Sequence, residues 1–461
     1  MDNKTQLQAN NARIEALTEI VKNKSTGGGS GGLDINGNLK QCEAGEALEA
    51  GDFVEIMSAE EVTGITTTRS QSGDKTYQYY KIAENKYLYF HRTNYSSGVG
   101  AMLIYKQDGK WVTKNPLSAG NIYDGASYSV SYRLDATKFL ICFGSGTYNY
   151  LYGTVVELVD DVLTVLKTTQ ISSTSRFVYS GMTAPQKLAD NTFAVTTKGQ
   201  TYGYVVSFTI NEDYSITLNS DKSSAEKWLS NLIPLDSDNL LLVVSSNANG
   251  YGTSNLYKYT ISSNTKSLVA NLSPLQSANY VPYKLVKIDT DNIAMFYCKG
   301  FSSSVDYFNS PTFCIVYNIT NNTTTSEVQI TGKTMWTEPV LLEENKVQFV
   351  SVLSDKSVQI NTITFSNGEF VNNSEQTFGL NPYSLYKITS SSAITTYPIS
   401  FLQLEDGLFL NAYFSSVNTM CGLLYNIPKA SKVTSSTQTI SGVTSKKADA
   451  GKLLDVYVPN V

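Results

Sequence analysis

Residues 235–244 read LDSDNLLLVV, a tight polar turn followed at once by a run of strand-forming apolar residues. The same pattern occurs seven times: IAENKYLYF (82–90), LDATKFLICF (134–143), LADNTFAVTT (188–197), LDSDNLLLVV (235–244), IDTDNIAMFY (288–297), LEENKVQFVS (342–351) and LEDGLFLNAY (404–413). Successive starting points are 52, 54, 47, 53, 54 and 62 residues apart. A repeat of about this length with several short strands is typical of a propeller blade. The sequence therefore predicts a mainly β chain that forms a seven-bladed β-propeller.

The strands of a single blade can be followed in the second repeat. They read SYSVSYRL (127–134), FLICF (139–143), YGTVVELV (152–159) and LTVLKTT (163–169), here called A, B, C and D in chain order. Polar pairs, Asp135-Ala136 and Asp160-Asp161, would close the A–B and C–D hairpins. In such a blade the A–B and C–D turns share one face of the propeller. The B–C loops and the D–A connections between blades share the other.

Composition excludes several classes of partner. The chain has 461 residues, a net charge of −5 and a single histidine. Its longest basic run is Lys446-Lys447, so neither nucleic acid nor an anionic membrane surface is an expected partner. No apolar run is long enough to span a bilayer, and the N-terminus lacks the apolar core of a signal peptide. We therefore expect synthesis in a cytoplasm.

The five cysteines are scattered and form no C-x-x-C pair. This pattern favours ordinary buried thiols over disulfides or a zinc site. We expect no metal and no cofactor.

An amphipathic helix is predicted near the N-terminus, at residues 4–24. Leu7, Ile14 and Val21 are seven residues apart, and Leu17 adds a position between them. The segment could be a frayed tail. A short coiled coil, or a helix docked on a partner, is the preferred interpretation, which makes these four residues candidates for attachment or oligomerisation.

The rest of the chain divides by composition. GGGSGG at 27–32 is a flexible tether. Ala-Gly turns precede alternating strands in both AGDFVEI (50–56) and AGKLLDVYV (450–458), so the two ends are predicted to pair in one small β module. The predicted division is a helical anchor (1–25), a linker (26–32), the first half of the module (33–70), the propeller (71–432) and the second half of the module (433–461).

The two ends also carry a family resemblance. The N-terminal helix, EAGEALEAGDFVEI (43–56) and ADAGKLLDVYVPNV (448–461) resemble parts of structural proteins, from tail, baseplate or decoration, of tailed bacteriophages and prophages of Firmicutes. The resemblance covers about 80 residues and none of the propeller. It implies a virion component, made in the host bacterial cytoplasm and attached to other virion proteins through its N-terminal helix.

The predicted B–C loops are rich in Tyr, Gly, Ser and Asn, as antibody combining sites are. Tyrosine faces can also stack on sugar rings. The candidate ligand-binding residues are Tyr95, Tyr148, Tyr150, Tyr152, Tyr202, Tyr251 and Tyr307, with Trp228 and Trp336 in or near D–A connections. The alternative is that tyrosine-rich loops merely suit β proteins. On the opposite face, Asp236, Asp238, Asp289 and Asp291 are predicted to be solvated turn residues.

Catalysis has little support, and we expect no enzyme. His91 is the sole histidine, so a nucleophile–histidine system has one possible base. Three functions stay open. The first is binding of a host cell-surface glycan by a virion surface protein, which could form a homo-oligomer. The second is structural decoration of the head, neck or tail. The third is cell-wall polysaccharide hydrolysis by two carboxylates.

Overall fold

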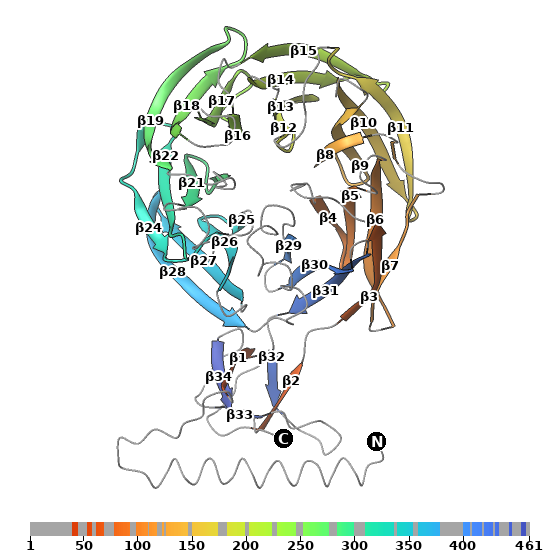
Figure 1. Ribbon diagram of the computed structural model, residues 1–461, viewed down its shortest axis with the longest axis vertical. Coiled ribbons are helices and arrows are strands. Elements are labelled where there is room, and N and C mark those ends of the chain that lie inside the picture. Colours follow the sequence, from red (N-terminus) through yellow and green to blue (C-terminus); the bar gives the residue numbers. More distant parts are fainter. Residues whose placement is uncertain are drawn as a thin grey trace.

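The computed structural model (Figure 1) shows a mainly β chain arranged as a β-propeller above a small barrel. It describes residues 39–44, 53–57, 61–68, 78–92, 98–108, 110–117, 122–123, 126–145, 150–173, 182–198, 202–223, 228–245, 252–275, 284–298, 309–335, 339–353, 358–378, 400–405, 408–416, 419–426, 429–432, 442–444 and 453–457. The described residues contain no helix. The predicted helical anchor, 1–25, and the linker, 26–32, lie outside them.

Six blades form the described propeller, each an antiparallel sheet whose strands follow chain order. The first blade contains β4 (Gln78–Ala83), β5 (Lys86–Arg92), β6 (Val99–Gln107) and β7 (Lys110–Lys114), and the second contains β8 (Ala126–Arg133), β9 (Lys138–Ser145), β10 (Tyr150–Val159) and β11 (Val162–Gln170). The third blade contains β12 (Gln186–Ala189), β13 (Thr192–Lys198), β14 (Gly203–Ile210) and β15 (Ile216–Ser223), and the fourth contains β16 (Trp228–Pro234), β17 (Asn239–Ser245), β18 (Gly252–Thr260) and β19 (Thr265–Leu275). The fifth blade contains β20 (Lys284–Lys287), β21 (Asn292–Cys298), β22 (Thr312–Asn318), β23 (Thr323–Thr324) and β24 (Val328–Thr331), and the sixth contains β25 (Val340–Glu343), β26 (Lys346–Val352), β27 (Val358–Ser366) and β28 (Glu369–Phe378). The prediction of a propeller is confirmed, and the described residues show six blades; a seventh blade stays a prediction.

A further four-stranded sheet follows the sixth blade, with the order β29 (Ser400–Glu405), β30 (Leu408–Ser416), β31 (Thr419–Asn426) and β3 (Glu61–Thr68). Its strands are described through their backbone pairing alone. This sheet joins the two ends of the propeller, because β3 comes from before the first blade and pairs with β31 from after the sixth.

The two end segments form a closed barrel. Its order is β1 (Leu39–Ala44), β32 (Lys429–Lys432), β2 (Phe53–Met57), β33 (Gly442–Thr444) and β34 (Leu453–Tyr457). β1 runs antiparallel to β34, from Leu39 opposite Tyr457 to Glu43 opposite Leu453. The segments on either side of the propeller therefore pair with each other, and the propeller is inserted between β2 and β32.

The boundary between the barrel and the propeller differs from the predicted one at both ends. β3 falls within the predicted module (33–70) but pairs with β31, whereas β32 falls within the predicted propeller (71–432) but pairs in the barrel. The reason is an antiparallel ribbon that is described in two parts, β2 with β32 and β3 with β31. Partner numbers fall steadily from Val54 opposite Lys432 to Thr68 opposite Thr419, so one pair of chains runs from the barrel into the sheet.

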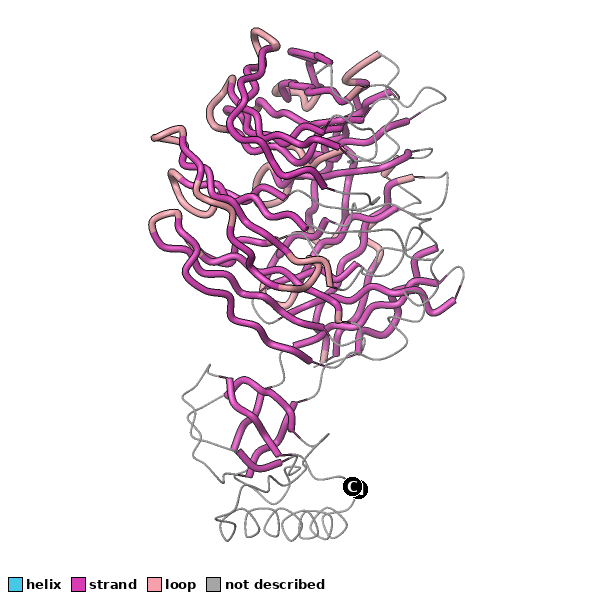
Figure 2. The backbone as a smooth tube through the Cα atoms, turned by 60° about the vertical axis from the view of Figure 1, so that its left-hand side comes forward, coloured by secondary structure: helices cyan, strands magenta, loops and turns pink. Residues whose placement is uncertain are grey.

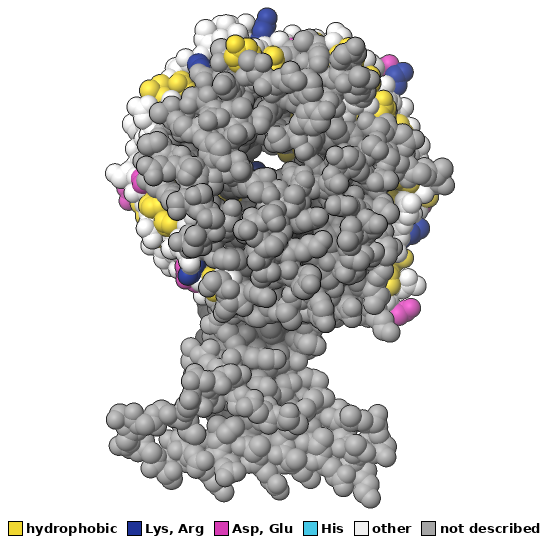
Figure 3. All heavy atoms as spheres, viewed as in Figure 1, with side chains coloured by type: hydrophobic (Ala, Val, Ile, Leu, Met, Phe, Trp, Pro, Cys, Tyr) yellow, Lys and Arg dark blue, Asp and Glu magenta, His cyan; other side chains and the backbone are white. Residues whose placement is uncertain are grey.

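The core lies between successive blades. Each of the five contacts between neighbours among the six blades holds its own cluster of buried apolar side chains. The B strands contribute on both faces, which explains their unbroken apolar runs, and every residue of β21 is buried. The apolar side chains most exposed among the described residues are Val159, Val162, Val165, Leu218, Leu268, Leu341 and Val371. In Figure 3, the described apolar atoms that are visible from this side lie mostly around the rim.

The repeated polar turn has a structural cause. In all six blades the carbonyl of one position in the A–B turn accepts the N–H of a residue at or next to the end of strand C. The acceptors are Asn85, Thr137, Asn191, Asp238, Asp291 and Asn345, at 2.7–3.0 Å. Asparagine adopts a positive φ at 85, 191 and 345, whereas the other three turns are held by the aspartate two residues before the acceptor. Figure 2 shows these turns along one side of the propeller.

Asp236 shows how the aspartate turn works. Its Oδ1 accepts the backbone N–H groups of Asp238 and Asn239, each at 2.8 Å. Asp238 then caps the neighbouring C–D turn by accepting the N–H and hydroxyl of Ser262, at 2.8 and 2.6 Å. The predicted turn role of these acidic residues agrees with these contacts.

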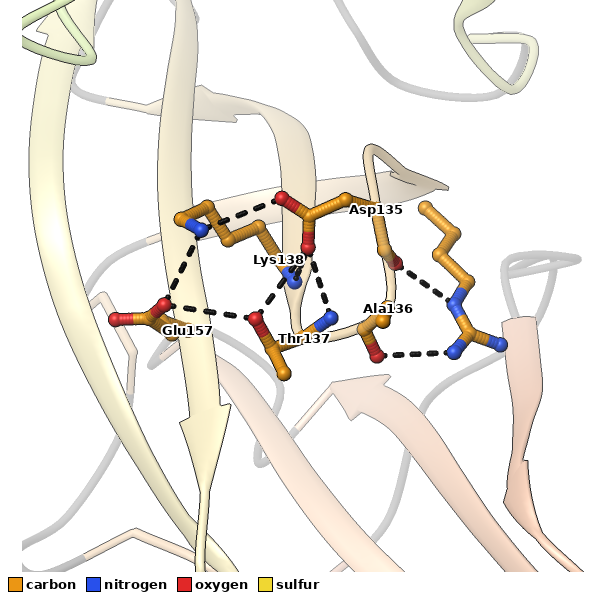
Figure 4. Close-up of polar contacts among 6 residues, drawn as sticks. Asp135, Ala136, Thr137, Lys138 and Glu157 are labelled. Carbon is orange, nitrogen blue, oxygen red and sulfur yellow. Dashed lines mark hydrogen bonds and ion pairs between the residues drawn. The ribbon is translucent and has the colours of Figure 1, made fainter.

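Figure 4 shows the matching turn of the second blade. Asp135 accepts the N–H groups of Thr137 and Lys138, and the Lys138 ammonium lies 3.3 Å from Asp135 and 3.2 Å from Glu157. Arg133 donates to the carbonyls of Asp135 and Ala136 in its own turn, and to the carbonyl of Lys81 in the first blade at 2.7 Å. The turn therefore also ties two blades together.

Candidate functional site

The structure describes only part of the predicted tyrosine-rich face. Tyr150 and Tyr152 lie at the start of β10, and Tyr202, 41% exposed, immediately precedes β14. Trp228 is the first residue of β16 and is described by its backbone only. The remaining candidates lie outside the described residues: Tyr95, Tyr148, Tyr251, Tyr307, Trp336 and the helix residues Leu7, Ile14, Leu17 and Val21.

Tyr152 belongs to an aromatic group at the contact between the first and second blades. Its ring stacks on Phe143 of β9, with ring centres 5.9 Å apart and planes 9° apart. Tyr123, from the connection between the blades, lies 5.7 Å from Tyr152 and 4.6 Å from Phe143. Phe143 is fully buried, whereas both tyrosines are half-buried. A buried ring therefore packs against two partly accessible ones.

The backbone fixes where these rings lie. The backbone carbonyl of Tyr123 accepts the N–H of Val99 at 3.0 Å, and the N–H of Ile122 donates to the carbonyl of Val99 at 2.7 Å. These two bonds hold the D–A connection against the start of β6. Tyr152 lies opposite Phe143 across the β9–β10 ladder. Because neighbouring strands hold both ends of the group, the rings are positioned before any ligand arrives.

Polar groups surround the rings and continue toward the third blade. The Tyr152 hydroxyl donates to Oε1 of Gln170 at 3.0 Å, and the Gln170 amide donates to the carbonyl of Ser172 at 3.4 Å. The Ser172 hydroxyl in turn donates to Asp221 of β15 at 2.7 Å. We call Tyr123, Tyr150, Tyr152 and Gln170 the tyrosine patch. It offers ring faces, one amide and phenol hydroxyls side by side.

The Tyr152 phenol is protonated at neutral pH. Burial, followed by the proximity of Tyr123 and Tyr150, raises the pKa of Tyr152 above its usual value. The phenol therefore keeps its proton well beyond neutral pH and can both donate and accept a hydrogen bond. Such a group suits recognition of uncharged hydroxyl-bearing ligands.

Sequence reasoning missed Tyr123, Phe143 and Gln170. The prediction took tyrosines from B–C loops but only tryptophans from D–A connections, although both kinds of segment share one face. Extending the same rule to tyrosines in the D–A connections would have found Tyr123. Phe143 lies within an apolar strand run and Gln170 at the end of β11, and neither carries a signal in sequence.

Other chemistry is sparse in the described part of the chain. No group of three or more His, Cys, Asp or Glu residues lies close enough there to hold a metal ion. His91 lies within β5, opposite Gly100 of β6. Cys142, Cys298 and Cys314 are buried thiols, and burial raises the pKa of each. Among the residues that the structure describes, no helix is long and apolar enough to cross a membrane.

Comparison with known proteins does not identify a family for this chain. No protein-family model and no curated protein matches this chain. Solved structures do match. A Bacteroides fragilis protein provisionally assigned as a 6-phosphogluconolactonase has 10% identity and a TM-score of 0.41, over 80% of this chain and 99% of its own.

Two further solved structures also match. A fungal alcohol oxidase of the AA5 family, in complex with copper, has 10% identity and a TM-score of 0.44, over 86% of this chain and 94% of its own. A mutant Aleuria aurantia lectin in complex with Fucα1-6GlcNAc has 10% identity and a TM-score of 0.36, over 68% and 97%. At these values the likeness does not extend to function. The chain is a β-propeller inserted in a small barrel, with a tyrosine patch at one contact between blades.

Proposed function

We propose that this protein binds a glycan through the face that carries its B–C loops and D–A connections. The tyrosine patch carries the proposal. The half-buried rings of Tyr123 and Tyr152 pack against the buried ring of Phe143, and the Gln170 amide lies beside Tyr152. Sugar rings bury their C–H faces on aromatic rings, and their hydroxyls pair with amides and phenols. The patch supplies both kinds of contact within one small area.

The patch favours binding without chemistry. A neutral phenol and an amide are weak acids and bases at physiological pH, whereas glycoside hydrolysis requires two suitably placed carboxylates. The polar chain from Tyr152 reaches the carboxylate of Asp221, whose Oδ2 accepts a hydrogen bond from the Ser172 hydroxyl. We therefore propose a binding protein, and treat the release of a reducing sugar as a result that would contradict the proposal.

We further propose that the protein is displayed on the virion of a tailed bacteriophage or prophage of Firmicutes, as the resemblance of its two end segments implies. The pairing of those segments in one barrel supports this proposal, because such a barrel could attach the inserted propeller to the particle. In this proposal the N-terminal helix attaches the protein to other virion components, and the sheet β29–β30–β31–β3 is the seventh blade. Many copies on one particle would turn weak single sites into firm attachment.

The first test is binding of the purified protein to an array of bacterial surface glycans. Tyr152→Ala should lower the affinity for a bound glycan at least tenfold, because it removes a stacking face and the donor to Gln170. Tyr152→Phe should lower it by about three- to tenfold, equivalent to one net hydrogen bond.

A matched control exists on the same propeller. The Tyr105 hydroxyl donates to Oε1 of Gln107 at 3.5 Å, beside the C–D turn on the opposite face. Tyr105→Phe likewise removes one phenol hydroxyl, and it should leave glycan binding unchanged. Equal losses in Tyr152→Phe and Tyr105→Phe would refute the patch as a binding site.

Particle location tests the virion proposal separately. Cryo-electron microscopy of intact particles should place the chain at the tail tip or baseplate, with propellers outward. A copy on the capsid, collar or tail tube would favour the decoration alternative, because it is badly placed to choose a host.

A further inference from the structure

One strand position allows the six described blades to be compared directly. It lies nine residues after the first residue of the repeat, as Phe143 does after Leu134, and it pairs with a residue near the start of strand C. The six pairs are His91 with Gly100, Phe143 with Tyr152, Thr197 with Tyr204, Val244 with Asn255, Tyr297 with Phe313 and Ser351 with Gln359. Among these six blades, the second and the fifth pair a Phe or Tyr ring with another.

The fifth blade repeats the arrangement found around Tyr152. Tyr297 is fully buried, and its ring stacks on the half-buried ring of Phe313, with ring centres 6.1 Å apart and planes 27° apart. On the outer strand, Gln329 lies opposite Phe313, just as Gln170 lies opposite Tyr152. Both glutamines are exposed. A buried ring, a half-buried ring and an exposed amide therefore follow one another across three strands in each of these blades.

The buried ring of the fifth blade is held at its polar end. The Tyr297 hydroxyl donates to the carboxylate of Glu327, an exposed residue just before β24. This bond and the strand pairing fix the surface against which Phe313 packs, so the ring is positioned before a ligand arrives. Phe313 has no hydroxyl, so it cannot bond the Gln329 amide as Tyr152 bonds Gln170. We call Phe313, Glu327 and Gln329 the phenylalanine patch.

We propose that the phenylalanine patch is a second glycan-binding site, which rests on the function proposed above for the tyrosine patch. The ring of Phe313 offers a face for the C–H side of a sugar. The Gln329 amide can donate to and accept from sugar hydroxyls, and the Glu327 carboxylate can accept from them. The same carboxylate repels an acidic sugar. The ligand class is therefore an uncharged glycan.

The two patches lie on one face of the propeller, three blades apart. Each is at the ends of strands C and D that adjoin the B–C loops and D–A connections. In Figure 1, β10 and β11 lie on one side of the ring, and β22 and β24 lie on the opposite side. One propeller would then hold two glycan chains, or two separate parts of one chain. Two linked weak sites bind a polymer more tightly than either site alone.

The test counts the sugars bound by each chain of the full-length protein. The probe is the strongest hit of the glycan array, used as a free di- or trisaccharide so that one molecule fills one patch. Native mass spectrometry should show up to two sugars per chain. Phe313→Ala should leave one, Tyr152→Ala should leave one, and the double variant should leave none.

The outcomes separate this proposal from the one on which it rests. A wild-type chain that binds one sugar, which Tyr152→Ala loses and Phe313→Ala keeps, would overturn the second site and leave the proposed function standing. Two sugars still bound by Phe313→Ala would also overturn the second site. A chain that binds no array glycan would overturn both proposals.

Two milder variants and one control keep the test independent of folding. Gln329→Ala changes an exposed side chain, so it should leave Tm unchanged while lowering the affinity of the second site about three- to tenfold. Phe313→Leu keeps an apolar side chain without the flat ring and should lower that affinity at least as much. Phe370→Ala is the matched control, because Phe370 is also half-buried but lies beside the C–D turn on the opposite face. Loss of a site in Phe370→Ala, or two unweakened sites in Phe313→Leu and Gln329→Ala, would exclude the phenylalanine patch.

Discussion

Gly153→Ala tests whether close packing between the second and third blades limits the stability of the propeller. Gly153 lies on β10, against the buried cluster shared by these blades. A Cβ atom at this position would overlap Cδ1 of Ile216 in the third blade and lie 3.0 Å from Cδ1 of Ile171. Both obstructing atoms are the ends of side chains, but Ile171 and Ile216 are buried in one apolar cluster, so these atoms can move only if their neighbours also shift.

The expected cost follows from two opposing terms. Overfilling a packed core costs about 1–3 kcal/mol, whereas alanine in a strand interior gains about 0.5–1 kcal/mol over glycine. Gly153→Ala should therefore lower the free energy of unfolding by roughly 1–2 kcal/mol. Ile216→Val removes the overlapping Cδ1 atom and alone should cost about 0.5–1.5 kcal/mol. Together the two changes should cost less than their sum, by about 1 kcal/mol or more.

Urea unfolding of the four proteins in this cycle measures the coupling. Gly332→Ala is the control, because a Cβ there meets no atom within 4 Å, and it should change stability by less than about 0.5 kcal/mol. Additive costs for Gly153→Ala and Ile216→Val, within about 0.5 kcal/mol, would refute the contact between these atoms.

Three further predictions concern the turn face. Arg133→Lys should destabilise the protein by roughly 1–2 kcal/mol in urea unfolding, because an ammonium cannot bond the carbonyls of Lys81, Asp135 and Ala136 together; an unchanged midpoint would contradict this. Asp236→Ala should cost about 1–2 kcal/mol and Asp236→Asn clearly less, because Asn keeps one acceptor oxygen; equal costs would contradict the turn role. Burial alone would raise the pKa of Asp135 and of Asp236, but the hydrogen bonds that each accepts outweigh it and lower the pKa. Their stabilisation is thus present above about pH 4 and is lost as pH falls further, so the acid dependence of Tm should be shallower in a double Asp→Asn variant.

The fold was largely predictable because the A–B turn recurs for a chemical reason. Each turn must place one carbonyl against strand C, and only aspartate at its start or asparagine with a positive φ does this readily. The barrel boundary was less predictable. β3 has ordinary strand composition, whereas β32 reads KASK and lacks β-branched and aromatic residues. The partners of both strands lie more than 350 residues away in sequence, as Val54 pairs with Lys432, and only the register of the ribbon sets them.

The site was predictable only in outline. Tyrosine-rich loops pointed to one face and to Tyr152, but stacking depends on which residues meet between blades. Phe143 faces Tyr152 because β9 and β10 are in that register, and Tyr123 joins them because a D–A connection is bonded to Val99. The buried polar contacts of the sixth blade are invisible in sequence for the same reason, since Ser351, Asn361 and Asn373 are separate polar residues until three strands align.

The ribbon that joins the barrel to the last sheet also governs how the molecule responds to tension. Its two chains, β2 with β3 and β32 with β31, cross from barrel to propeller side by side. A pull that separates the two bodies stretches both chains in the same direction, so it neither slides one past the other nor peels them apart. Pulling on the barrel therefore does not load the pairing of β3 with β31, which joins the two ends of the propeller. The propeller could change its orientation, or be pulled through its barrel, while its ring of sheets stays closed.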